Sequence, residues 1–436
     1  MMSKLFFSLF TLVIFCFSAT SAFSFQTTIS PRLRVSEEYD DNIFLTRVDK
    51  EADYITAVSI GFTSELLTKK SEFSLSYDPQ YNTYAKRPEL NSWNHLATLN
   101  AKSRIAKHIE FGLSDIFRYT DDPNFYVETF EDEFKGIITR DFTIRKTRQI
   151  YYSNTARADL SFQLSDSDTF GLQYLYSFLE NQDPELEDNR RHEASMAYNH
   201  RFSPLYNLEM DVSYTRGEFE TAEDFEEWGG TFRLTKSFTK HLDGFLAYEH
   251  TLIGFDGDGV DYQVYNPSIG FSYEIMKQTS LSLSGGYFYQ DRDGGGGESG
   301  PTGDAEIEQT FEKGSISFFG SGGADESYFG SENLGFGTYY EVGGRFSWAL
   351  TQTLSVNAEA AYRKNEYPEF DETRRDDINR ASIGFLYAPW KIKWLFIDLS
   401  YTYSNVDSND NENDYANNQV LLVITLTPEQ PFKRTF

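Results

Sequence analysis

The sequence predicts an all-β protein, a single transmembrane antiparallel β-barrel of about 18 to 20 strands in the outer membrane of a Gram-negative cell. Three observations lead to it: a period-two alternation of apolar and polar residues, a secretory leader, and a composition too polar for a large buried core. Residues 72–81 (EFSLSYDPQY) show the alternation most cleanly. Successive side chains of a strand point to opposite faces of a sheet, so each such segment has one apolar and one polar face. With a mean hydropathy of -0.51, so many amphipathic strands suit a closed sheet with lipid outside and water inside.

The first 22 residues differ from the rest and predict a signal peptide that ends after Ala22. Lys4 precedes the apolar run Leu5–Phe17, and small residues at 18–22 supply a cleavage site. The apolar run has about 13 residues, whereas a membrane-spanning helix needs roughly 20. The single cysteine, Cys16, lies inside this run. The predicted mature chain, residues 23–436, therefore contains neither a disulfide nor a thiolate site.

The bulk composition narrows the class of protein further. Lys and Arg number 39 and Asp and Glu number 67, and the resulting net charge of -28 excludes a nucleic-acid partner held by a basic surface. The aromatic content of 17% is typical of a barrel with girdles of Tyr and Phe at both membrane interfaces. We expect outer-membrane lipid and the barrel assembly machinery as partners, and no cofactor.

The strands follow one another along the chain with long loops at one end of the barrel and short turns at the other. Turns are predicted where Lys, Pro or Ser-Asp clusters separate two alternating segments, for example at 69–70, at 165–168 and at Pro204. The apolar positions of the first thirteen predicted strands lie at 33–35, 54–62, 73–81, 93–99, 111–119, 152–162, 170–178, 194–202, 208–214, 228–234, 242–248, 265–273 and 281–289.

The alternation weakens between residues 291 and 337 and then recovers. Residues 291–304 contain four consecutive glycines and predict a flexible loop, whereas 305–311 and 316–318 alternate only in part. Counting these two segments gives twenty strands, and treating 291–337 as one outer loop gives eighteen. Both counts are even, as a barrel with both chain ends on one side requires. The last five predicted strands have their apolar positions at 340–348, 354–362, 381–387, 395–403 and 420–426.

The polar faces of these strands predict the wall of an aqueous lumen. They carry charges of both signs, while the long predicted extracellular loops carry most of the acidity, as at 183–188, 218–227 and 407–414. Two interpretations stay open: a hydrated wall whose charges pair with one another, and an acidic mouth that attracts cations and repels polyanions. The predicted lumen-facing residues are Arg32, Arg34, Glu72, Asp78, Arg157, Asp159, Glu193, Arg201, Glu209, Asp211, Glu359, Arg363 and Asp398.

One loop contains a weak candidate for a metal site. In the stretch DGDGVD, Asp256, Asp258 and Asp261 are spaced like the first carboxylates of a calcium loop. The last ligand of that pattern is an acid, and Pro267 stands in its place. Asp and Gly are also ordinary loop residues, so we expect no metal site and no catalytic residues. The six histidines show no metal-site spacing, and Ser and Asp are too common here to indicate a hydrolase.

Four short motifs carry a family resemblance: EEYDDNIF at 37–44, RYTDDP at 118–123, SENLGF at 331–336 and LLVITLTP at 421–428. With these motifs the chain resembles the putative beta-barrel porin 2 family, and within it the outer-membrane proteins associated with the PEP-CTERM and exosortase systems. The resemblance spans nearly the whole predicted mature chain and transfers no active-site residues. It implies an outer-membrane barrel encoded alongside exopolysaccharide export, with the polysaccharide and its export apparatus as partners.

The end of the chain departs from what outer-membrane barrels commonly show. Phe436 supplies a terminal aromatic residue, but Pro428 and Pro431 interrupt the alternation that leads to it. Proline disfavours continuous strand pairing. The last strand is therefore expected to end near Thr427 and to be followed by a periplasmic tail.

The sequence predicts a porin-like conduit through the lumen without covalent chemistry, and the resemblance implies a link to exopolysaccharide secretion. The first alternative is a structural or adhesive surface barrel whose lumen is plugged and whose loops bind a partner. The second is an outer-membrane enzyme with its active site at the barrel wall. Step currents in a lipid bilayer would separate the conduit from the plugged barrel.

Overall fold

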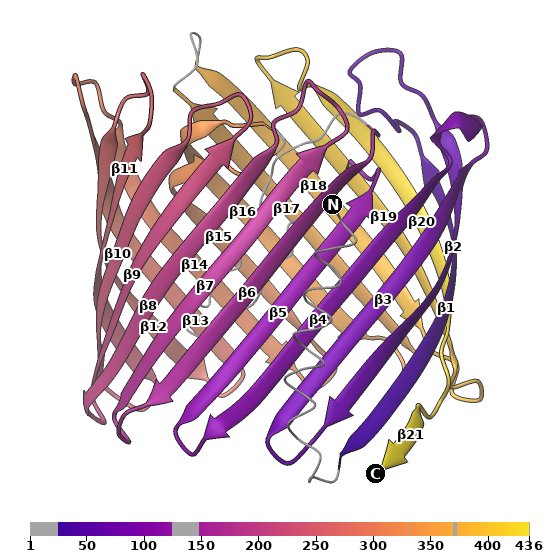
Figure 1. The fold of residues 1–436 in the computed structure, drawn as a ribbon, viewed down its shortest axis with the longest axis horizontal. Helices are drawn as coiled ribbons and strands as arrows, with labels where there is room; N and C mark the ends of the chain where they lie inside the picture. The colour runs from indigo at the N-terminus through magenta and orange to yellow at the C-terminus, as the bar shows by residue number, and fades with distance from the viewer. Residues whose placement is uncertain (1–24, 124–147, 331, 369–372, 436) are drawn as a thin grey trace.

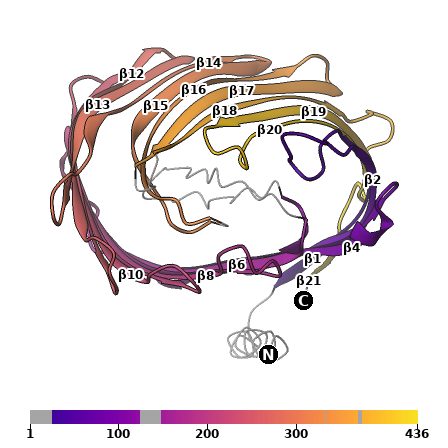
Figure 2. The same ribbon diagram turned by 90° about the horizontal axis from the view of Figure 1, so that it is seen from above.

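The structure is a computed structural model, and it describes residues 25–123, 148–330, 332–368 and 373–435. These residues form a closed antiparallel barrel (Figure 1 and Figure 2), because the first of twenty long strands pairs with both the second and the twentieth. The all-β barrel prediction is confirmed, with twenty strands. The predicted signal peptide and most of the connection from 121 to 148 lie outside the described residues.

The strands are longer than the sequence suggests, mostly 13 to 15 residues. They are β1 (Gln26–Asp40), β2 (Asp53–Leu67), β3 (Ser71–Tyr84), β4 (Ser92–Ala106), β5 (Ile109–Thr120), β6 (Tyr151–Gln163), β7 (Asp168–Asn181), β8 (Asn189–Ser203), β9 (Tyr206–Phe219), β10 (Phe225–Ser237), β11 (Leu242–Phe255), β12 (Tyr262–Met276), β13 (Thr279–Arg292), β14 (Ser299–Phe311), β15 (Gly314–Ser327), β16 (Gly335–Ala349), β17 (Leu354–Tyr367), β18 (Arg374–Tyr387), β19 (Leu395–Ser408), β20 (Tyr415–Leu426) and the short β21 (Phe432–Thr435). One 3-10 turn, η1 (Pro88–Leu90), lies between β3 and β4. Among the described residues, no helix is long and apolar enough to cross a membrane.

Connections of two kinds alternate around the barrel and define its two ends. Each odd-numbered strand from β1 to β19 leads into the next strand by a longer loop, and we call this side the loop end. Most even-numbered strands lead onward by short turns, with a seven-residue connection after β18 as an exception, and this side, the turn end, also holds β21 (Figure 1). The difference in length at the two ends is as predicted from the sequence.

The region of weak alternation is a hairpin of two strands, β14 and β15, so the twenty-strand alternative is correct and the alternative of a single loop over 291–337 is wrong. β14 pairs with β13 on one side and with β15 on the other. Its alternation is faint because several outward positions hold residues with little or no side chain. Gly303 pairs with Gly322, and Ala305 pairs with Gly320. Small residues dilute the apolar signal without disturbing the backbone pairing.

The chain end forms more structure than the expected periplasmic tail. β20 ends at Leu426, close to the predicted position, and Pro428 and Pro431 interrupt the ladder. Pairing then resumes, because β21 lies antiparallel to residues Gln26–Ile29 of β1. Both strands at the seam therefore meet β1, with β20 covering its loop-end half and β21 its turn-end half.

The outer face of the barrel is apolar and carries aromatic pairs toward both ends. Tyr81 and Trp93 have ring centroids 5.1 Å apart, and Tyr214 and Trp228 lie 4.9 Å apart, all on outward positions toward the loop end. Toward the turn end, Trp348 lies 5.5 Å from the ring of Phe311. Such belts are typical of barrels that sit between two membrane interfaces.

Candidate functional site

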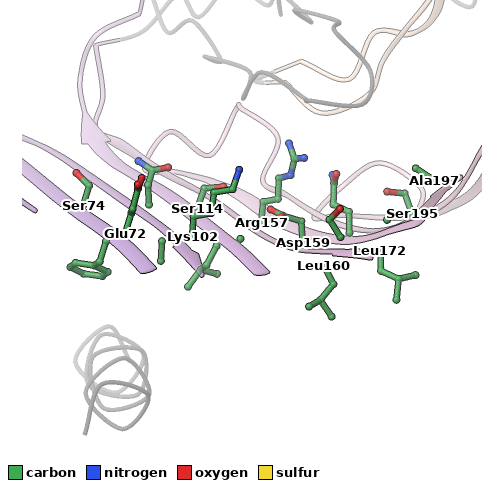
Figure 3. A pocket seen from close by; sticks show the side chains of 18 of the residues that line it. Glu72, Ser74, Lys102, Ser114, Arg157, Asp159, Leu160, Leu172, Ser195 and Ala197 are labelled. Carbon is green, nitrogen blue, oxygen red and sulfur yellow. The ribbon is translucent and has the colours of Figure 1, made fainter. Parts of the chain in front are cut away.

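The inner wall of the barrel is polar, as strict alternation requires. Figure 3 shows the side chains of Arg157 and Asp159 on the lumen side of β6, while Leu160 and Leu172 point away from it. Cross-strand pairing keeps this order from strand to strand, since Leu160 pairs with Leu172 and Asp159 pairs with Gln173. The lumen is therefore lined by side chains that water and polar solutes can contact.

All of the predicted lumen-facing residues occupy inward positions, and several of them form ion pairs with side chains of other strands. Arg32 donates to Asp78 at 2.7 Å across β2. Glu209 lies 3.9 Å from Arg233 of β10, and Glu359 lies 3.5 Å from Arg345 of β16. The other members of the predicted set are Arg34, Glu72, Arg157, Asp159, Glu193, Arg201, Asp211, Arg363 and Asp398.

A groove follows the inner wall in the turn-end half of the lumen, along β2 to β9. It has a volume of about 420 Å³ and contains four carboxylates and two cationic side chains (Figure 3). The carboxylates are Glu65, Glu72, Asp159 and Asp211, and the cations are Lys102 and Arg157. This half of the wall is therefore polar and on balance acidic.

The loop-end half of the lumen contains a hairpin that leaves the barrel wall. Residues 323–327 of β15 pair only with residues 335–339 of β16, because the pairing of β15 with β14 ends at Gly322 and the pairing of β16 with β17 ends at Thr338. We call residues 323–337 the inner hairpin. Seen from above, this part of the chain lies inside the ring of strands (Figure 2).

One face of the inner hairpin packs against the inner wall. Phe336 is fully buried, with its ring centroid 5.7 Å from that of Tyr262 on β12 and 6.2 Å from that of Phe288 on β13. Tyr328 lies 4.7 Å from Phe225 of β10, and its hydroxyl is 2.7 Å from that of Tyr262. An apolar cluster inside an otherwise polar lumen holds the hairpin in place.

The tip of the inner hairpin reaches both sides of the barrel. On one side, Asn189 of β8 donates to the carbonyl of Gly330 at 3.0 Å. On the other side, Arg374 of β18 donates to Glu332 at 2.8 Å. β8 and β18 are ten strands apart in the barrel of twenty, and they lie on opposite sides of the ring in Figure 2. The hairpin therefore crosses the lumen.

Buried arginines hold the base and tip of the hairpin by ion pairs. Arg363 of β17 pairs with Asp325 on the hairpin and lies 3.7 Å from Glu341, and its guanidinium stacks 4.1 Å from the ring of Tyr339. Arg374 also pairs with Asp376 at 3.0 Å. Both arginine side chains are less than a tenth exposed, and so are Glu341 and Asp376, whereas Asp325 and Glu332 on the hairpin are about a third exposed. Solvent therefore screens the pairs with the wall more weakly than those with the hairpin.

The loop between β1 and β2 narrows the lumen at the barrel seam. Ile43 is fully buried against Ile55 and Tyr84, on the inner face of β2 and β3. Leu45 packs on the opposite flank, in a cluster with three side chains of β18, β19 and β20. The EEYDDNIF motif thus ends in a segment that folds into the barrel.

A buried polar network ties this loop to the next long connection. Arg148 donates to the carbonyl of Ile43 at 2.6 Å, to the hydroxyl of Tyr84 at 3.0 Å and to Asp40 at 3.1 Å. The Tyr84 hydroxyl donates in turn to Asp121 of the RYTDDP motif at 2.8 Å. Two motifs that lie far apart in the sequence therefore meet in one network on the inner wall.

The weak metal candidate in the loop between β11 and β12 is not assembled. Asp256 accepts a hydrogen bond from Arg216 at 2.5 Å, and Asp261 accepts one from the backbone of Phe255 at 2.9 Å. Within the described part of the chain, no group of three or more His, Cys, Asp or Glu side chains could hold a metal ion. These aspartates shape the loop instead.

Part of the sequence matches the model of one protein family. Residues 331–427 match the family model described as Putative beta-barrel porin 2. The match covers the end of the inner hairpin and the strands from β16 to β20. Comparison with curated proteins gives no match.

Solved structures from two bacteria are similar to this chain at low sequence identity. Acinetobacter baumannii OccAB3 is 12% identical with a TM-score of 0.46, and the alignment covers 94% of this chain and 99% of that one. Pseudomonas aeruginosa OpdO is 13% identical with a TM-score of 0.45, covering 92% and 97% of the two chains. At these values the likeness does not bear on the function or the cargo of this chain.

The architecture of the described residues indicates in which membrane the barrel lies. A closed antiparallel sheet with an apolar exterior and a polar interior is the form of outer-membrane proteins. The protein is an outer-membrane β-barrel of porin-like architecture.

Proposed function

We propose that the barrel is a passive aqueous conduit for hydrophilic solutes, with its loop end facing outward and a preference for uncharged and cationic cargo. The observation that carries this proposal is the turn-end groove, where four carboxylates and two cations line the wall. An acidic wall in a narrow lumen attracts cations and repels anions.

A salt gradient across a planar bilayer provides the test. With the purified barrel inserted, we expect step currents and a reversal potential of the sign that cation preference gives. A reversal potential of the opposite sign would overturn the proposed selectivity. The absence of any current would overturn the conduit.

A more specific proposal is that the cargo is an exopolysaccharide that the cell secretes. It rests on the resemblance carried by the four motifs and on a lumen wall rich in hydroxyl and charged side chains. Deleting the gene and measuring surface polysaccharide tests it, and we expect reduced export. Unchanged export would remove the polysaccharide from the proposal while leaving the conduit in place.

A second function is favoured by the inner hairpin. Because the hairpin touches β8 and β18 together, it divides the loop-end half of the lumen. A barrel that stays closed in this way would act as a structural or adhesive surface protein. Conductance distinguishes the two functions, since the closed barrel carries no step currents.

A further inference from the structure

The connections at the turn end are basic, although the chain as a whole has a net charge of -28. The ten connections that follow the even-numbered strands contain more lysines than acids. The lysines are Lys69, Lys70, Lys107, Lys240, Lys277, Lys313, Lys391 and Lys393, and the acids are Asp166, Glu312 and Glu429. Lys393 pairs with Glu429 at 2.6 Å, and within the described part of the chain the other lysines of this set form no ion pair. The turn end therefore carries positive charge that an external anion can neutralise.

Lys236 brings the same charge onto the lipid-facing side of the wall. It lies near the turn end of β10, directly opposite Tyr206 of β9 and Gly244 of β11, three strands that are neighbours in Figure 1. Residues directly opposite one another share a face of the sheet. The next outward positions of these strands are Leu208, Leu234 and Leu246. Lys236 is therefore a cation at the edge of an apolar surface.

Two aromatic rings hold the half-buried side chain of Lys236 in place. Its Nζ lies 5.3 Å from the ring centroid of Tyr206 and 5.0 Å from that of Phe238. The Phe238 ring lies over Gly244, where an added methyl group would approach it to 2.8 Å. Cation–π contacts orient the ammonium but bring no negative charge to it. The rings position the charge without neutralising it.

Two polar groups of this site have no partner of their own. Within the described residues, the Lys236 ammonium forms no ion pair or hydrogen bond, and the Tyr206 hydroxyl forms no hydrogen bond. Both groups are hydrogen-bond donors. They lie beside each other on one face of the wall, so one oxyanion can accept from both.

We infer that Lys236, Tyr206 and Phe238 form a binding site for an anionic phospholipid. The Lys236 ammonium and the Tyr206 hydroxyl hold the phosphate, and an acyl chain follows the leucines of β9 to β11. A phosphate at the edge of the hydrocarbon layer has apolar surface on one side and the basic turn end on the other, as this site provides. The turn end favours a head with net negative charge, such as phosphatidylglycerol, over a zwitterionic head that brings its own cation.

The place of the site in the membrane follows from the orientation proposed above. With the loop end facing outward, the site lies in the inner leaflet of the outer membrane, which is built of phospholipids. The inference concerns the outer face of the barrel, so it does not depend on which solutes cross the lumen. Lipid binding and conductance are measured separately, and one can fail without the other.

Native mass spectrometry of the full barrel in mild detergent, with added phosphatidylglycerol, counts the lipids that stay bound. Lys277→Gln is a matched control for Lys236→Gln, because it removes the same charge from a turn at the same end. We expect the wild type and Lys277→Gln to retain the lipid alike, and Lys236→Gln to retain about fivefold less, the factor for one lysine near an anionic surface. Lys236→Arg should restore retention. Equal retention by the two glutamine variants would overturn the site.

Tyr206→Phe tests the second donor, because it removes the hydroxyl and keeps the ring. We expect weaker retention of phosphatidylglycerol, with folding checked by the heat-dependent gel shift of the barrel. Unchanged retention in the folded variant would contradict the phosphate contact assigned to Tyr206.

The wild type tests the ligand class. It should retain phosphatidylglycerol in preference to phosphatidylcholine, and glycerol phosphate, which has the head without acyl chains, should not displace the lipid. Equal retention of the two lipids would overturn the anionic class. Displacement by glycerol phosphate would assign the site to a soluble anion and overturn the lipid.

Discussion

The two halves of the lumen are built by the same alternation of residues, yet they differ in almost every physical property. The turn-end half is an open groove lined by Glu72, Arg157 and other side chains that carry charge. The loop-end half is filled by two apolar clusters around Phe336 and Ile43, and by buried arginines. The charges of the turn-end half can select among solutes, and the side chains that fill the loop-end half set the width of the lumen. If the barrel conducts as we propose, resistance to flow and selectivity reside at different levels of one pore.

The largest effect is expected from removing what fills the loop-end half. Replacing residues 325–336 by two glycines removes the inner hairpin and the contact between β8 and β18, so the lumen at this level becomes wider. We expect a severalfold rise in single-channel conductance. Replacing the loop at 183–187 by two glycines serves as the control and should leave conductance near the wild-type value. Equal conductance of the hairpin variant and the wild type would show that the constriction lies elsewhere.

The ion pairs of the inner hairpin should matter more than those of the open wall. Arg363→Gln leaves the buried Glu341 without its cation and also removes the pair with the partly exposed Asp325, and breaking a buried pair costs about 3 kcal/mol or more. Arg345→Gln removes a pair on the inner wall that is more than a third exposed, at a cost of about 1 kcal/mol or less. Thermal unfolding in detergent, read by the gel shift of the folded barrel, should rank the two variants in this order. The reverse order would contradict the role given to Arg363.

The charges of the turn-end half should set selectivity without changing stability much. Glu72→Gln combined with Asp159→Asn removes two of the four carboxylates of the groove, so cation preference should fall. Arg157→Gln should raise it. Reversal potentials in a salt gradient measure both shifts. Selectivity that is the same in all three proteins would place the filter in the loop-end half.

The smallest effect is expected in the loops outside the lumen. Arg216 donates to Asp256 and lowers the pKa of that carboxyl below its ordinary value. A carboxyl with a lowered pKa stabilises the folded state above its unfolded pKa, and this contribution disappears as the pH falls through the lowered value. Asp256→Asn should therefore lower the thermal midpoint slightly at pH 7 and not at strongly acidic pH. A larger difference in acid than at neutral pH would contradict this assignment.

Much of the barrel can be predicted from the sequence, because period-two alternation reports directly on which face each residue occupies. The lumen-facing positions of Arg32, Asp159 and Glu359 follow from this rule alone. The rule fails where outward residues are small, as at Gly303 and Gly320, since glycine gives no apolar signal. The strand count was open for that reason.

The inner hairpin could not be predicted from alternation. Side chains continue to alternate between two faces after β15 and β16 leave the wall. The alternation therefore does not show where the hairpin leaves the wall. A signal was present in the composition of the loops, because Phe329, Leu334 and Phe336 are too apolar for an exposed loop. The same holds for Ile43 and Leu45 in the first loop. Which wall they pack against depends on residues far away in the sequence, such as Tyr262 and Ile378.

Cross-linking tests the central claim, that the inner hairpin crosses the lumen, most directly. In protein with Cys16→Ser, the pair Asn189→Cys and Gly330→Cys probes one wall, and the pair Glu332→Cys and Arg374→Cys probes the opposite wall. We predict that a short bifunctional thiol reagent joins both pairs in isolated outer membranes, whereas Asn189→Cys with Arg374→Cys, on opposite walls, is not joined. Cross-linking of neither hairpin pair would contradict the account.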